Sequence, residues 1–235
     1  MHRQLRHLLV PALVLALAGP AAAACSVPDN GTGTIDLPPA CPDGWEGPMA
    51  IVDGLPVGST ISVAGALNDF SGASEVAGGT LAGQLQSFGG NLHMALTGTG
   101  SLAGFNRLVA LPCTIETHSA PRTPGDPVQS FDTVLFMMQG QITGDPDFDL
   151  LRVTAGGGFG MPSPGHTTLT REGAAGTPFD VDSFFDITYR IDFVGAPGGS
   201  LGGMSGSTTG TELFQMGGGS VAVEASTFSS LKSLY

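Results

Sequence analysis

The sequence predicts an all-β protein, an antiparallel β-sandwich or a jelly-roll-like domain, and three observations support this fold class. Helical periodicity is nearly absent after the first 24 residues. Short runs of alternating apolar and polar residues recur along the chain, separated by clusters of Gly, Pro, Asn and Asp. A period of two is typical of strands with one buried and one solvated face. About ten such runs favour packed layers of strands over an open sheet.

Residues 1–24 have the order of parts of a secretory signal peptide. Arg3 and Arg6 give a positive start, residues 8–18 are apolar, and Ala22, Ala23 and Ala24 stand directly before Cys25. The apolar run is shorter than the roughly 20 residues that a membrane-spanning helix needs. No later segment approaches that length. We therefore expect cleavage after Ala24, an exported chain (secreted, periplasmic or at the cell surface) and no transmembrane span.

The segment that follows, residues 25–47, is rich in Pro and Gly and contains two of the three cysteines. A disulfide between Cys25 and Cys41 closes the shortest loop, although three cysteines allow three single pairings. A cysteine at the cleavage point also suits a lipid anchor. The Leu that usually precedes a lipidated cysteine is absent, since Ala22 stands three residues before Cys25. Both uses of Cys25 stay open at this point.

Residues 48–216 are expected to form the β-sandwich domain. Its clearest strand is the run from Phe185 to Phe193, in which every second residue is apolar. Because side chains alternate across a strand, the apolar residues of this run should face the core. Further strands are expected near residues 48–53, 59–65, 80–88, 91–97, 105–115, 131–142, 149–154, 166–171 and 207–215.

The last segment, residues 217–235, begins with a Gly-rich joint. A last strand is expected at residues 220–224, and beyond it Phe228, Leu231 and Leu234 recur at helical spacing. A short C-terminal helix is therefore expected.

The charge of the chain excludes some partners. Without residues 1–24, 6 Lys and Arg stand against 20 Asp and Glu, a formal net charge of −14. Affinity for nucleic acids comes largely from Lys and Arg that neutralise phosphates, and the same argument holds for anionic lipid surfaces. We therefore expect neither to bind.

Alternating carboxylates provide the best candidate for a metal site. Asp145, Asp147 and Asp149 could converge on Ca²⁺, which prefers clustered oxygen ligands. The EF-hand pattern is absent, because Leu150 stands where that loop has its turn Gly and Gly156 where it has its bidentate Glu. The alternative is a solvated acidic turn, since carboxylates are mostly exposed.

No catalytic residues can be assigned from the sequence. Ser205 lacks the second Gly of a nucleophile elbow, because Ser207 occupies that place. His93, His118 and His166 are far apart in sequence and have no spacing typical of zinc ligands. Each of the three is expected at the surface.

Three segments resemble those of uncharacterised exported bacterial proteins: residues 53–61, residues 144–148 together with 161–166, and residues 182–186. The resemblance covers most of the exported chain. It implies a source class, and it carries no activity and no site residues.

Taken together, these features predict an exported non-catalytic β-sandwich protein that serves as a surface, matrix or appendage component. An alternative is an extracellular ligand-binding module, assisted by Ca²⁺ at the three aspartates. A third hypothesis is a hydrolase whose dispersed site a single sequence does not reveal.

Overall fold

The computed structural model describes residues 25–216 of the 235-residue chain. Within that range the protein is all-β, as the sequence predicts, and every pair of neighbouring strands is antiparallel. The only helical segments there are the short 3₁₀ turns η1 (Gly100–Leu102) and η2 (Gly157–Phe159). The strands are β1 (Cys25–Val27), β2 (Trp45–Ile51), β3 (Ile61–Gly78), β4 (Gly83–Gly98), β5 (Asn106–Ser119), β6 (Val128–Thr143), β7 (Phe148–Ala155), β8 (Pro164–Arg171), β9 (Phe179–Gly195) and β10 (Ser205–Met216).

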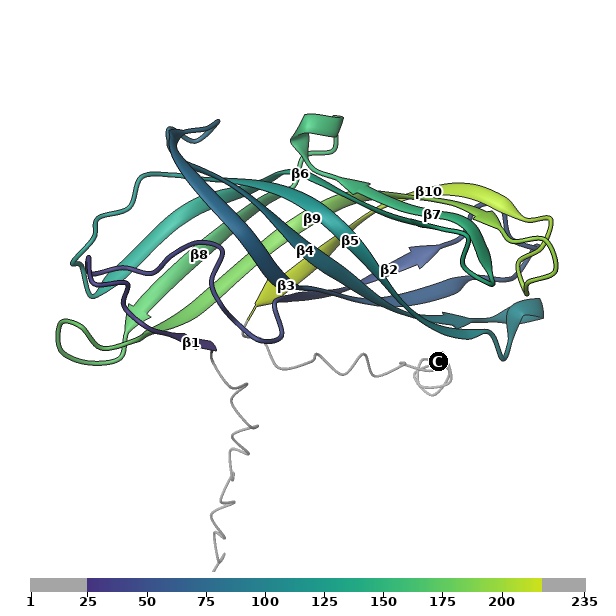
Figure 1. Ribbon diagram of the computed structural model, residues 1–235, viewed down its shortest axis with the longest axis horizontal. Coiled ribbons are helices and arrows are strands. Elements are labelled where there is room, and N and C mark those ends of the chain that lie inside the picture. The colour runs from purple at the N-terminus through teal and green to yellow at the C-terminus, as the bar shows by residue number, and fades with distance from the viewer. Residues whose placement is uncertain (1–24, 217–235) are drawn as a thin grey trace, which may run out of the picture.

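The strands form one sheet that closes on itself. Its order is β1-β9-β10-β2-β3-β4-β5-β6-β7, and β7 pairs with β9, which stands near the start of that order. β8 pairs with both β6 and β9 beside it. Figure 1 shows the result as an elongated body whose strands run obliquely to its long axis. One face of the sheet therefore surrounds the core and the other faces solvent.

The alternation predicted for β9 is confirmed. The apolar residues of the run at 185–193 are all buried, and the residues between them are exposed or half-buried. Aromatic rings from other strands meet this row. Trp45 of β2 lies 5.3 Å from Phe185 and 5.2 Å from Phe70 between ring centroids, and its Nε1 donates a hydrogen bond to Ser183 Oγ at 3.2 Å. The only Trp of the chain is thus part of the core.

The seam between β10 and β2 is the weakest part of the closure. Only Gln215 and Glu46 are in register as backbone partners. The side chain of Thr208 in β10 also contributes: its Oγ1 accepts hydrogen bonds from the backbone amides of Val52 and Asp53 at 3.1 and 3.0 Å. The threonine hydroxyl therefore adds two hydrogen bonds to a seam that has one pair of residues in register.

Two strands expected near residues 80–88 and 91–97 are a single strand, β4, so this prediction was wrong. Gly89 and Gly90 lie in its middle and suggested a turn. A Cβ at Gly90 would lie 3.1 Å from atoms of Phe70 and Ile115. These glycines therefore make room for packing across the sheet and do not end the strand.

The segment before β2 is held to the sheet by a disulfide within it and by a short strand. Cys25 and Cys41 form a disulfide with their Cα atoms 5.7 Å apart, and β1 pairs with the start of β9. Ile35 and Leu37 between them are buried in the core. In Figure 1 this segment, in purple, lies at the left end of the body beside β8 and β9. It contributes to the site described below.

Some predictions fall on the ends of the chain. The signal peptide (1–24) and the last strand and helix (217–235) lie outside the described residues. Within residues 25–216, no helix has the length and apolarity that crossing a membrane requires.

Candidate functional site

A polar cleft of about 470 Å³ opens where the N-terminal segment meets the sheet. Three parts of the chain form its walls: the segment at 30–36, the β3–β4 hairpin, and the loop between β5 and β6. None of them is close to another in sequence. Its lining residues are Asn30, Thr32, Thr34, Asp36, Glu75, Ala82, Gly83, Gln84, Ala120, Pro121, Arg122 and Pro124.

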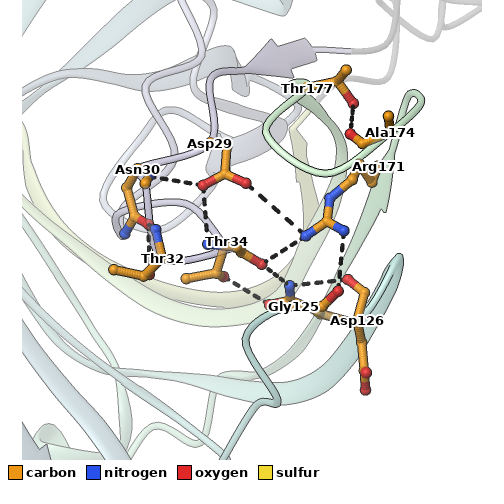
Figure 2. A network of polar contacts seen from close by, with 12 residues as sticks. Asp29, Asn30, Thr32, Thr34, Gly125, Asp126, Arg171, Ala174 and Thr177 are labelled. Atoms are coloured by element: carbon orange, nitrogen blue, oxygen red, sulfur yellow. Dashed lines mark hydrogen bonds and ion pairs between the residues drawn. The ribbon is translucent and has the colours of Figure 1, made fainter.

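A buried ion pair fixes the N-terminal wall of the cleft (Figure 2). Arg171 Nη2 lies 4.0 Å from Asp29 Oδ2, and both side chains are only 5–6% exposed. Asp29 Oδ1 accepts hydrogen bonds from the amides of Gly31 and Gly33 at 2.8 and 3.0 Å. The guanidinium also donates to the carbonyls of Gly33 and Gly125 at 3.1 and 3.0 Å. Arg171 thus joins the N-terminal segment to the loop on the opposite wall.

The close approach of these two loops depends on glycine. Gly33 has φ of +85°, and a Cβ there would lie 2.7 Å from the amide nitrogen of Gly125. The same two residues share a backbone hydrogen bond of 2.9 Å. Gln129 lies beneath them: it donates to the Gly33 carbonyl at 2.7 Å and accepts from Thr34 Oγ1 at 2.7 Å. Backbone and side-chain hydrogen bonds therefore hold this wall together.

Arg122 is the one basic side chain that lines the cleft. Its Nη1 donates to Thr34 Oγ1 at 3.0 Å and to the Ile35 carbonyl at 2.9 Å, and its Nη2 donates to Gln84 Oε1 at 3.2 Å. All of these acceptors are neutral. Burial lowers the pKa of the Arg122 guanidinium, against the charges of Glu75 and Asp36, but an arginine stays charged at any physiological pH.

Arg122 differs in this from the other arginines of the described range. No carboxylate lies within 4.0 Å of it, whereas each of the other four is paired with an aspartate at that distance or less: Arg107, Arg152, Arg171 and Arg190. The charges of Glu75 and Asp36 act on this guanidinium only from beyond that distance, and its carbon lies 5.7 Å from the centroid of the Phe131 ring. The cleft therefore contains a cation that no carboxylate of the described chain contacts.

Two carboxylates face the same cleft with spare acceptor capacity. Asp36 Oδ1 accepts from Asn30 Nδ2 at 2.8 Å, and Glu75 Oε1 accepts from Gln84 Nε2 at 2.5 Å. Among the described residues, none donates to the second oxygen of either carboxylate. The cleft thus contains a guanidinium and two free carboxylate oxygens, and the charges of both carboxylates act on the guanidinium.

A second array resembles a catalytic triad. His166 Nδ1 lies 2.9 Å from Asp132 Oδ1, and His166 Nε2 lies 2.7 Å from Ser130 Oγ. The order of groups is that of a nucleophile, a base and an orienting carboxylate. All three side chains project from the outer face of β6 and β8, and the side chain of Asp132 is 76% exposed. The array therefore lies on the outward face of the sheet and is open to water.

His118 was expected at the surface and is instead buried, with only 3% of its side chain exposed. β5 continues through this residue, and a register shift between Glu116 and Thr117 breaks the alternation of the strand. The Thr80 amide donates to His118 Nδ1 at 3.1 Å, so the neutral ring carries its proton on Nε2, facing Glu116 at 2.9 Å. Its ring stacks on Phe136, which gives it a structural role.

The other two histidines lie where the sequence suggested. His93 is on the exposed face of β4, 2.9 Å from Asp69, and His166 is half-buried on the outer face. Hydrogen bonds from His93 and then Asn91 lower the pKa of Asp69.

The three aspartates considered for Ca²⁺ are only partly brought together. Arg107 Nη2 lies 2.5 Å from Asp145 Oδ2, and Arg107 Nε lies 3.2 Å from Asp147 Oδ2. Asp149 is exposed on β7. In the part of the chain that the structure describes, no three His, Cys, Asp or Glu residues are grouped so as to hold a metal ion. A guanidinium stands where two of the carboxylates converge.

The sequence analysis missed the cleft and Arg122. One signal was present: Arg122 is one of few basic residues, and it lies between two prolines in Ala120-Pro121-Arg122-Thr123-Pro124. Its partners come from segments some 40 and 90 residues away, which no local pattern reveals.

The structure is that of an all-β antiparallel protein with a cleft lined mostly by polar residues where its N-terminal segment meets the closed sheet. Comparison with protein-family models, curated proteins and solved structures finds no match to this chain.

Proposed function

We propose that this chain is an exported, non-catalytic, sandwich-like β protein that acts as a surface or matrix component by binding an extracellular ligand in the Arg122 cleft. The observation that carries this proposal is the cleft itself. A guanidinium that no described carboxylate contacts and two carboxylates with free oxygens converge there, in walls held by hydrogen bonds. Convergent polar groups in a concave site of a few hundred Å³ are typical of ligand binding.

Export is supported by the signal-like first 24 residues and by the disulfide. Disulfides form and persist mainly in oxidising compartments, outside the cytosol. Cys25 uses its Sγ in the disulfide, and a lipid anchor would need that same atom. We therefore propose a chain that begins at a disulfide-bonded Cys25 and has no lipid. Intact mass and N-terminal sequencing of the exported protein test both points; an added lipid mass or a retained Met1 would contradict them.

The proposal of a non-catalytic role rests on the surroundings of Ser130. A serine nucleophile needs an oxyanion site and exclusion of water besides its base. Ser130, His166 and Asp132 lie instead on an outward-facing pair of strands. We expect a fluorophosphonate probe to leave Ser130 unlabelled, and Ser130→Ala to leave any background ester hydrolysis unchanged. Stoichiometric labelling that Ser130→Ala and His166→Ala both abolish would make the hydrolase hypothesis the leading one.

Binding is tested with material from the cells that produce the protein. The exported chain should be retained on their washed extracellular matrix or surface fraction, and Arg122→Lys should be retained less. Arg190→Lys is the matched control, because it makes the same change at an exposed arginine outside the cleft. Failure of the wild-type chain to bind any such fraction would contradict this function.

A further inference from the structure

We propose that the ligand of the Arg122 cleft is a hydroxylated carboxylate, the uronic acid residue of an acidic saccharide, with its carboxylate on Arg122 and its hydroxyl groups on Asp36 and Glu75. This inference rests on the proposed function and names the chemical class that the cleft accepts.

The Arg122 guanidinium has N–H groups left for the carboxylate of a ligand. Thr34, Ile35 and Gln84 occupy three N–H directions of the Arg122 guanidinium, which has five in all. No described residue accepts from Nε. The remaining N–H groups lie in the wall of an open cleft, and a planar guanidinium matches a carboxylate in two parallel hydrogen bonds. A ligand carboxylate would give Arg122 the partner that the other four arginines already have.

The second step concerns the hydroxyl groups. The free oxygens of Asp36 and Glu75 accept hydrogen bonds and donate none, so they require donors on the ligand. Sugar hydroxyls are such donors and carry no charge. A simple dicarboxylate would bring a second negative charge into a cleft that already holds Asp36 and Glu75, and a neutral sugar would leave Arg122 without a directly bonded anion. A uronic acid has one carboxylate and several hydroxyl groups, and it satisfies both sides.

The third step concerns size and long-range charge. A cleft of about 470 Å³ is within the range of small-molecule sites and holds a short oligosaccharide rather than a long chain. The net charge of −14 repels a polyanion, but salt screens this repulsion beyond about 8 Å at physiological ionic strength. We therefore expect short uronate oligomers to bind at least as well as long ones.

The experiment compares two probes on the disulfide-bonded exported chain. Oligogalacturonate of three to four residues and its fully methyl-esterified form have nearly the same shape, and only the first carries carboxylates. Titration calorimetry should show binding of the free acid and at least tenfold weaker binding of the ester. The free acid should also protect Arg122 from phenylglyoxal, measured by peptide mass spectrometry on the wild-type chain. This arm does not depend on any variant.

Variants then locate the site. Arg122→Lys keeps the charge and loses the planar fork, so the affinity for oligogalacturonate should fall at least tenfold, while Arg190→Lys should bind as the wild type does. Circular dichroism and the melting temperature of each variant establish that it is folded.

The outcomes are distinct. Equal affinity for acid and ester would overturn the ligand class and leave the binding function standing. Binding of the acid without protection of Arg122 would overturn the assignment to this cleft. Retention on matrix material together with no affinity for uronate would refute only this inference, whereas loss of both would refute the proposed function as well.

Discussion

Each of several arginines pairs with aspartates in a different part of the fold. Arg171 holds the N-terminal segment, Arg107 holds the loop before β7, and Arg152 joins β7 to Asp192 of β9. A chain with so few cations uses most of them to neutralise its own carboxylates. This is why an arginine without a carboxylate partner, Arg122, points to a ligand.

The pair of aspartates on Arg107 leads to a prediction about Ca²⁺. We expect millimolar Ca²⁺ to change the melting temperature by less than about 1 °C, because a guanidinium already neutralises Asp145 and Asp147 and exposed carboxylates bind Ca²⁺ weakly. Differential scanning fluorimetry with Ca²⁺ and Mg²⁺ measures this. A large, saturable rise with Ca²⁺ alone that Asp147→Asn abolishes would establish the aspartates as ligands.

Asp192 gives a prediction about pH. Burial would raise its pKa, but hydrogen bonds from Ser207 and Arg152 and the charges of Arg190 and Arg152 outweigh burial and hold it below the ordinary value. A lowered pKa stabilises the fold above the unfolded-state pKa of about 4, and this stabilisation is lost as the pH falls through the native pKa.

Asp192→Asn should therefore cost about 1 kcal/mol at pH 7 and progressively less below about pH 4. Chemical denaturation across this pH range checks the trend. Asp186→Asn makes the same change at an exposed position of the same strand and serves as the control for the substitution itself. A cost for Asp192→Asn that stays constant down to pH 2 would contradict the explanation.

Cys113 is expected to be inert in the folded protein. Burial raises the pKa of its thiol to about 11, and its Sγ donates to the Leu111 carbonyl at 3.2 Å. At pH 8 only about one molecule in a thousand then carries the reactive thiolate. Iodoacetamide should label no cysteine in the native exported chain and one in denaturant without reductant. Two or more labelled cysteines in that denatured sample would mean that Cys25 and Cys41 are not paired.

At the level of single strands, the alternation of apolar and polar residues predicted which side chains are buried, but it did not predict which strands pair. The alternation of β9 identified its buried row, because the side-chain period of a strand is fixed by backbone geometry. The order of the strands depends on pairings distant in sequence, such as that of β7 with β9, and no run of residues encodes them visibly. The cleft is assembled by the same distant pairings, so its residues could not be predicted as a group.

The contribution of Thr208 to the seam between β10 and β2 can be measured by substitution. Thr208→Val keeps the shape of the side chain and removes the acceptor for the amides of Val52 and Asp53, so it should cost about 1–2 kcal/mol. Thr209→Val changes an exposed threonine of the same strand and should stay within about 0.5 kcal/mol. Urea denaturation of both variants measures the difference. Equal stabilities would mean that water or the backbone replaces the hydroxyl at the seam.

At the scale of the whole molecule, a closed sheet leaves few free strand edges, and the N-terminal segment covers one end of it (Figure 1). Two of the anchors that hold this segment are of different kinds. The disulfide joins Cys25 to Cys41, and the ion pair between Asp29 and Arg171 holds the part of the segment that follows Cys25 (Figure 2). Because one wall of the cleft belongs to this segment, the site depends on both anchors.

The contributions of the disulfide and of the ion pair can be measured separately by substitution. Joint replacement Cys25→Ser and Cys41→Ser removes a cross-link over a separation of 16 residues and should cost about 3 kcal/mol, because the unfolded chain gains freedom. The ion pair remains in this variant, so hydrogen exchange should rise at residues 35–44 and stay low at 29–34. Adding Arg171→Met leaves Asp29 buried without its partner and should expose 29–34 as well, while β9 stays protected. Hydrogen-exchange mass spectrometry resolves these segments. If the cysteine variant loses protection across β9 at the same time, the N-terminal segment is an integral part of one cooperative fold, and the cleft has no wall that moves independently of the sheet.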